Sequence, residues 1–212
     1  MGKTPLIVGI SGGSAAGKTT VTGALAESLK MHHPVVLNQD HYFRDWEDVP
    51  TEKREAVRTS NHPRAVLWDA LIGHVQALRA GAPIVVPVPG TRAYKRGDDA
   101  KTIVPDGIVF VEGHLIFGNP TLRDLFDVRL FLDVDTHERV LRRMMRDTAR
   151  SGMTLEGAVA WYRKDVIPNY PVCTTPTRQF ADVVVPFEGD TQKGLDVLAN
   201  GLNILIASTD RV

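Results

Sequence analysis

The chain has 212 residues, of which 43% are hydrophobic and 24% are charged, the balance of a folded soluble domain. Because 25 Lys and Arg residues offset 25 Asp and Glu residues, no overall charge draws the protein to nucleic acid or to an anionic membrane. Cys173 is the only cysteine, which excludes an intrachain disulfide and zinc sites built on several thiolates. With no signal-like start and no apolar run near the ~20 residues of a membrane span, we expect a cytoplasmic protein.

Five short apolar runs predict strands that are buried on both faces of a parallel sheet. These runs are residues 5–10, 34–38, 107–111, 128–132 and 182–185. Segments with helical spacing alternate with them, at residues 18–31, 63–79, 136–150, 155–167 and 193–206. The alternation predicts an α/β fold, a parallel sheet flanked by helices, as a single domain over residues 1–212.

Two regions depart from simple alternation. Residues 45–101 are rich in proline and hold a short strand-like run at 84–88, and we interpret them as a substrate-binding insertion over one end of the sheet. Residues 136–167 contain two predicted helices separated by a small-residue break at Ser151 and Gly152. Since such breaks often act as the hinges of lids, we expect a lid-like helical region here.

A phosphate-binding loop follows the first predicted strand. The segment GGSAAGKT matches the pattern GxxxxGK[ST], with a strand before it and a helix after it. Backbone N–H groups and the positive end of the helix then form an anion site, in which Lys18 reaches the β- and γ-phosphates of ATP or GTP and Thr19 binds Mg²⁺. The alternative is a glycine-rich turn that binds nothing. The predicted nucleotide-binding residues are Gly12, Gly13, Ser14, Ala15, Ala16, Gly17, Lys18, Thr19 and Thr20.

Two carboxylates follow predicted strands at the edge of the sheet where parallel strands end and ligands bind. Asp40 comes after the run 34–38, and Glu112 comes after the run 107–111. Asp40 is suited to accept a proton from an attacking hydroxyl, and both acids are suited to bind Mg²⁺ or its water shell. The alternative is that each acid caps a turn or a helix.

A stripe of arginines recurs at helical spacing within residues 136–150. Separations of three and four residues place most of them on one helix face, where guanidinium groups bind phosphate oxygens and stabilise a phosphoryl group in transfer. We expect the two nearest the helix ends, Arg139 and Arg150, to be solvated. The alternative is surface charge, paired in part with Glu138 and Asp147. The stripe consists of Arg139, Arg142, Arg143, Arg146 and Arg150.

Together these motifs resemble the uridine kinase-like P-loop kinases, a family that includes uridine/cytidine kinase and relatives of phosphoribulokinase and pantothenate kinase. The motifs occur in the same order and at similar spacing as in that family, across about residues 7–186. They are IVGISGGSAAGKTT, QDHYF, NHP, VEGHL, RDLFDVRLFLDVDTHERVLRRMMRD and PTRQFADVVVP. The resemblance implies a P-loop NTPase-type fold and transfer of a phosphoryl group from ATP or GTP, with Mg²⁺, to a hydroxyl, typically the 5′-OH of uridine or cytidine. It also implies that Asp40 is the catalytic base and that Lys18 binds the phosphates. Thr19 and Glu112 would be the Mg²⁺ ligands, and Arg143 and Arg146 would be arginines on the lid side of the site.

The sequence departs from this family where relatives hold the nucleoside. Four residues differ from those usual in the family. Phe43 replaces a Tyr and Asn61 replaces the Asp that precedes the HP dipeptide, while Tyr94 replaces a His and Trp161 replaces a Gln. Relatives read PVYDF where residues 87–91 read PVPGT, and RGR where residues 151–153 read SGM. Since a pocket built for hydrogen bonds rejects ligands that leave its groups unpaired, we expect a rebuilt acceptor pocket. Its predicted residues are Phe43, Asn61, His62, Tyr94 and Trp161.

The acceptor is therefore predicted to be a small hydroxylated molecule, with a pyrimidine nucleoside as the first choice. A second interpretation is a kinase for a sugar phosphate, a pantothenate-like acid or nicotinamide riboside, and Arg92, Lys95 and Arg96 suit an acidic acceptor. A third is a nucleotide-binding regulatory protein without transfer activity, although such a switch needs no base at Asp40. A monomer and a homo-oligomer both remain open.

Overall fold

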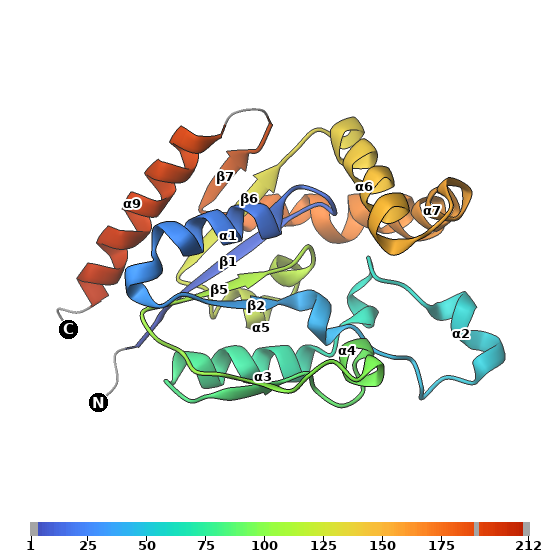
Figure 1. Cartoon of the computed structure of the whole chain (residues 1–212), viewed down its shortest axis with the longest axis horizontal. Coiled ribbons are helices and arrows are strands. Elements are labelled where there is room, and N and C mark those ends of the chain that lie inside the picture. The colour runs from blue at the N-terminus through green and yellow to red at the C-terminus, as the bar shows by residue number, and fades with distance from the viewer. Residues whose placement is uncertain (1–3, 189–190, 210–212) are drawn as a thin grey trace.

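The computed structural model describes residues 4–188 and 191–209, and it confirms the predicted α/β architecture (Figure 1). A parallel sheet has the strand order β2-β5-β1-β6-β7. The strands are β1 (Leu6–Gly12), β2 (Val35–Asn38), β5 (Ile108–Glu112), β6 (Val128–Asp133) and β7 (Val183–Pro186). Ile10 pairs with Glu112, and Asn38 pairs with the same residue from the other side. The carboxyl ends of the central strands therefore meet at one edge.

Helices cover both faces of this sheet, because successive side chains of a strand point to opposite sides. Val8 belongs to a core cluster with α1 (Lys18–Ser28) and α9 (Gln192–Thr209). Its neighbour Ile7 belongs to the cluster on the other face, where α3 (Trp68–Arg79) and α5 (Pro120–Arg123) pack. No helix within residues 4–188 and 191–209 combines the length and apolar character needed to cross a membrane.

The predicted insertion lies between β2 and β5, and it contains one helix of the main core. Leu71, Val75 and Leu78 of α3 are fully buried in the cluster that also holds Val109 of β5. The remaining parts are peripheral: α2 (Thr51–Val57), α4 (Arg92–Arg96) and a small antiparallel ribbon of β3 (Ile84–Val86) and β4 (Lys101–Ile103). Thus α3 acts as the crossover helix that joins two parallel strands.

The lid-like region lies beyond the carboxyl edge of the sheet, where Figure 1 shows α6 and α7 side by side. Helix α6 (Thr136–Ser151) ends at Gly152, whose φ of +65° is a left-handed conformation that favours glycine. Helix α7 (Leu155–Trp161) continues into a wider π-helical turn over Tyr162–Val166 and then into α8 (Ile167–Asn169). Pro168, near the start of α8, lacks a backbone N–H and so donates no helical hydrogen bond.

Candidate active site

The phosphate-binding loop connects the buried strand β1 to helix α1. Two of its glycines have positive φ, +143° at Gly12 and +89° at Gly17, which other residues rarely adopt. A Cβ at Gly13 would overlap the guanidinium of the buried Arg139 and lie 2.9 Å from the ring of Tyr170, so a side chain there would displace both groups. Gly17 caps α1 without a side-chain hydrogen bond, which leaves the first N–H groups of the helix free for an anion.

Lys18 opens α1 and folds over this loop. Its Nζ donates hydrogen bonds to the carbonyl oxygens of Gly12 and Gly13, both over 3.0 Å. Burial lowers the pKa of Lys18 to about 8, although the carboxylates of Asp40 and Glu112 favour its charged form. A cation held at the mouth of an N–H-rich loop is the arrangement that binds phosphate oxygens.

Glu112 ends β5 and is almost fully buried. Its Oε1 accepts hydrogen bonds from the Thr19 hydroxyl, over 3.0 Å, and from the Asn38 amide, while its Oε2 accepts from the Thr22 hydroxyl over 3.1 Å. Oxygen donors of this kind, a hydroxyl beside a carboxylate, fit Mg²⁺. Sequence reasoning missed Asn38 and Thr22, although Asn38 is the polar last residue of a strand.

Asp40 follows β2 and is exposed at the carboxyl edge of the sheet, where Glu112 also lies. Its backbone N–H donates to Oδ1 of Asn38 over 2.7 Å, which links it to the Glu112 cluster. None of the hydrogen bonds among the described residues uses the Asp40 carboxylate. That group is therefore available to a ligand, whereas Glu112 is held by three neighbours.

A cavity of about 1120 Å³ brings most of the predicted site together. Its lining includes the loop, the two acids and, from the predicted acceptor residues, Phe43 and Asn61. Residues Gly12, Gly13 and Ala16 form the buried floor of the loop behind it. The predicted site residues in the lining are Ser14, Ala15, Gly17, Lys18, Thr19, Thr20, Asp40, Phe43, Asn61, Glu112, Arg143 and Arg146.

Three predicted acceptor residues lie outside this lining. Nδ1 of His62 accepts a hydrogen bond from the backbone N–H of Arg64 and caps a short helical turn. Tyr94 is 54% exposed on α4, and the Trp161 ring faces the cations of Arg58 and Lys164. Their contact with an acceptor stays a prediction, because the residues that face the cavity are different ones.

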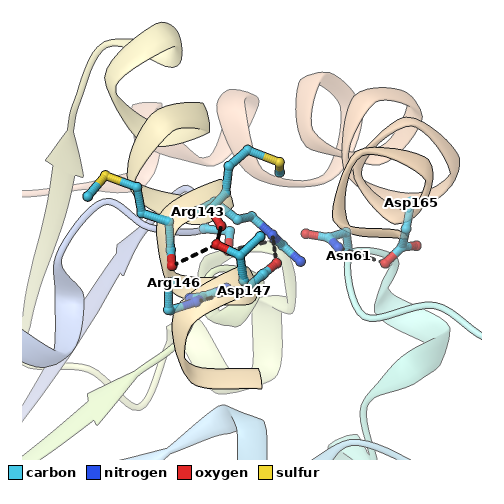
Figure 2. Close-up of polar contacts among 9 residues, drawn as sticks. Asn61, Arg143, Arg146, Asp147 and Asp165 are labelled. Carbon is cyan, nitrogen blue, oxygen red and sulfur yellow. Dashed lines mark hydrogen bonds and ion pairs between the residues drawn. The ribbon is translucent and has the colours of Figure 1, made fainter. Parts of the chain in front are cut away.

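Arg143 and Arg146 line the cavity from α6 and share one acid (Figure 2). Arg143 Nε donates to Oδ2 of the buried Asp147 over 3.1 Å, and its Nη1 donates to the Ser14 hydroxyl of the phosphate loop over 2.8 Å. Arg146 donates from Nε and Nη2 to Oδ1 of Asp147 over 3.0 and 2.9 Å. The predicted pairing with Asp147 is therefore confirmed, while phosphate binding by Arg143 and Arg146 stays a prediction.

The expectation that Arg139 is solvated is wrong. Its side chain is 2% exposed, and it donates to the carbonyl oxygen of Val134 over 3.1 Å and to the Thr136 hydroxyl over 2.9 Å. Its guanidinium also lies 4.1 Å from the ring centre of Tyr170. The first turn of α6 packs on the phosphate loop, which covers a position that helical spacing alone leaves at the helix end. The side chain of Arg150 lies outside the described residues.

Asp165 is a buried residue of the site that sequence reasoning did not identify. Its carboxylate accepts hydrogen bonds from the Asn61 amide over 2.7 Å, the Ser60 backbone N–H over 2.8 Å and the Thr59 hydroxyl. Figure 2 shows Asn61 and Asp165 facing one another. No local signal marks this role of Asp165, because its partners in the insertion lie about a hundred residues earlier in the chain.

His114 is a second residue that was missed, although it follows Glu112 closely. Its Nε2 donates to the carbonyl oxygen of Ser60 over 2.8 Å, so the neutral ring carries its proton there and its Nδ1 is an acceptor. Burial, together with the charge of Lys18, lowers the pKa of His114 to about 4. The ring also lies 6.1 Å from that of Phe43, and it ties the strand edge to the loop that carries Asn61.

Comparisons with known proteins identify the family of this chain. The model of the Phosphoribulokinase / Uridine kinase family matches residues 7–193. Proteins named uridine kinase are 33% identical in Bacillus licheniformis, over 97% of both chains, and 32% identical in Ligilactobacillus salivarius, over 98% of this chain and 97% of the relative. The structure of phosphoribulokinase from Rhodobacter spheroides shares the fold, with a TM-score of 0.59 at 13% identity over 85% of this chain and 69% of that one. Because the family model matches most of the chain and relatives more than 30% identical align over almost its whole length, this chain belongs to the Phosphoribulokinase / Uridine kinase family of ATP-dependent kinases.

Proposed function

We propose that the protein transfers the γ-phosphoryl group of ATP to a hydroxyl of a small metabolite, with Asp40 as the general base. The observation that carries this proposal is the cavity shared by Lys18, Glu112 and Asp40, whose carboxylate takes part in no hydrogen bond among residues 4–188 and 191–209. A protein that only binds nucleotide needs the first two groups. The third is needed only where a proton leaves an acceptor.

Positioning and charge supply most of the catalysis in this scheme. The phosphate loop and Lys18 bind the phosphates, and Arg143, next to Ser14 of that loop, stabilises charge on the phosphoryl group in transfer. Thr19 and Glu112 are the residues that would hold Mg²⁺, which when bound neutralises phosphate charge. Arg146, from the same helix as Arg143, also lines the cavity.

Asp40 acts on the acceptor. As the acceptor oxygen forms a bond to the γ-phosphorus, the bond from that phosphorus to the bridging oxygen breaks and ADP leaves. The hydroxyl proton passes to the Asp40 carboxylate, which later returns it to solvent. The exposure of Asp40 at the cavity supports this role, and so does the engagement of Glu112 with three other donors.

Two classes of acceptor follow from the observations. The relatives named uridine kinase make a pyrimidine nucleoside the first candidate. The second is a hydroxylated molecule with an acidic group, which is favoured by Arg92 and Arg96, the two arginines of α4 among those that line the cavity.

ADP release in the presence of ATP and Mg²⁺ tests the proposal. The panel of acceptors contains uridine, cytidine, a pentose, its 5-phosphate, and a hydroxy acid with its amide. Wild-type protein should release ADP faster with at least one of them, and Asp40→Asn should lose this stimulation. If ATP binds but no acceptor in a broad screen stimulates ADP release, the regulatory alternative replaces the kinase proposal.

A further inference from the structure

The acceptor end of the cavity contains a cation, Arg92, that pairs with no carboxylate among the described residues. Arg92, the first residue of α4, lines the cavity. Its Nε donates to the carbonyl oxygen of Arg44 over 3.1 Å, its Nη1 to the Ser60 hydroxyl over 2.9 Å and its Nη2 to the carbonyl oxygen of Thr59 over 2.8 Å. All three acceptors are neutral, and Arg92 forms no ion pair within the part of the chain that the structure describes.

The surroundings of Arg92 make this positive charge costly. Its guanidinium lies 5.2 Å from the ring centre of Phe43. Burial lowers the pKa of Arg92 to about 10, with a further contribution from the positive charge of Arg58, while Asp165 and Asp40 oppose the change from a distance. A desolvated cation that lacks a counter-ion is unfavourable, so a bound anion at this position would stabilise the protein.

Helix α4 presents a second cation to the same cavity. Arg96 lies four residues after Arg92, on the same face of the helix, and it also lines the cavity. Its guanidinium pairs with Asp98 at an exposed position. Lys95, between them in sequence, pairs instead with Glu47 and lies outside the cavity lining. The helix therefore separates two cavity-facing arginines from one outward-facing lysine.

We propose that the phosphoryl acceptor carries an anionic group, a phosphate monoester or a carboxylate, which Arg92 and Arg96 bind while Asp40 faces the reacting hydroxyl. A guanidinium has five N–H donors, and the three bonds to neutral oxygens leave two for a ligand. Hydrogen bonds between two charged groups are the strong ones and they give directional recognition. This inference rests on the proposed kinase activity and narrows its substrate class to acidic hydroxyl compounds.

Matched acceptor pairs test the inference by turnover. Each pair has a neutral and an anionic member: a pentose with its 5-phosphate, and the amide of a hydroxy acid with the acid itself, with uridine and cytidine as further neutral compounds. We expect wild-type protein to prefer an anionic member. Arg92→Gln should raise KM for that member about 10- to 100-fold, more than it raises KM for ATP. Arg96→Gln should have a smaller effect in the same direction. Efficient use of uridine, or equal use of both members, would overturn the inference and leave the kinase proposal standing.

Because Arg92 also joins segments of the insertion, Arg92→Lys serves as a second variant that keeps the charge and loses the planar fork. Lys95→Gln is the matched control on the same helix, and it should leave anion binding unchanged.

A binding experiment uses inorganic phosphate and acetate as probes, with the nucleotide site filled by a non-hydrolysable ATP analogue and Mg²⁺. One of the probes should bind wild-type protein and lose affinity in Arg92→Gln, with an intermediate loss in Arg92→Lys. Equal binding by wild-type protein and all three variants would overturn the inference. Arg92-dependent binding without any acceptor-stimulated ADP release would instead overturn the kinase proposal.

Discussion

The Asn61 amide donates a hydrogen bond to Oδ2 of Asp165 over 2.7 Å, and this bond joins the predicted insertion to the lid-like helical region. The resemblance to uridine kinases implies an Asp at position 61. In this chain an Asp there would face the carboxylate of Asp165 at hydrogen-bond distance. The Asn at position 61 is therefore matched to Asp165, and the departure from the family pattern has a structural reason.

Asn61→Asp should destabilise the protein at pH 7 and above by about 1–3 kcal/mol, because two buried carboxylates would meet where a hydrogen bond now exists. The loss should shrink as pH falls, since a single proton shared by the pair restores a donor. The double variant Asn61→Asp with Asp165→Asn should recover most of the stability. Urea unfolding at several pH values measures this, and a single variant as stable as the wild type would contradict the prediction.

Lys18→Ala should abolish phosphoryl transfer and leave the fold intact. The Lys18 ammonium bonds only the loop carbonyls of Gly12 and Gly13 among the described residues, so its removal costs little packing while phosphate loses its main cation. Circular dichroism and ADP release with the best acceptor measure the two effects. Turnover at the wild-type rate would contradict the assignment of the phosphate loop.

Asp40→Asn should lower kcat by about 100-fold or more with a smaller change in ATP affinity, because general-base catalysis typically contributes 10²–10⁴-fold. Glu52→Gln is a matched control, since Glu52 is an exposed acid on α2 away from the cavity lining. Steady-state kinetics and nucleotide titration separate the two parameters. A rise confined to KM for the acceptor would make Asp40 a binding residue.

The arginines of α6 should divide into two groups. Arg143→Ala and Arg146→Ala should reduce kcat more than ATP affinity, because their contacts with phosphate strengthen as charge develops. Arg142→Ala should have the smaller effect, because Arg142 lines the cavity but is held by Glu138 over 2.7 Å, whereas Arg143 also donates to Ser14 of the phosphate loop. Similar small losses of kcat in all three variants would show that the stripe is ordinary surface charge.

Arg139→Ala should instead destabilise the fold. The variant removes a buried side chain that stacks on Tyr170 and bonds Val134 and Thr136, and it leaves the Val134 carbonyl without this donor. We expect a loss of about 1–3 kcal/mol in urea unfolding. A variant with wild-type stability and reduced kcat alone would place Arg139 in catalysis.

The free energy of unfolding should fall on acidification partly because of His114. Its pKa in the folded protein, about 4, lies below the ordinary value of 6.5, so between these values the unfolded chain binds a proton that the folded protein excludes. Stability therefore rises with pH across this window and is independent of His114 above it. His114→Asn should flatten this part of the curve of unfolding free energy against pH, and an unchanged slope would contradict the assignment.

Short-range patterns predicted the main elements and the phosphate-binding loop. The strands of the parallel sheet, the helices α1, α3, α6, α7 and α9 and the loop from Gly12 to Thr19 follow from periodicity and from glycine and lysine spacing, because backbone preference and burial act over a few residues. The short elements α2, α4, α5 and β4 were not predicted. Asp40 and Glu112 could also be predicted from the sequence, since residues that follow parallel strands converge at one edge of the sheet.

The sequence predicted Phe43 and Asn61 at the acceptor end of the cavity, but the contacts of that end were decided by tertiary structure. Asp165 meets Asn61 across 104 positions, and the burial of Arg139 depends on how α6 packs against the phosphate loop. Likewise, only the orientation of α4 separates Arg92 and Arg96, which face the cavity, from Lys95, which faces outward. Sequence spacing tells which side chains share a helix face, but which face meets the cavity depends on packing between segments far apart in the chain.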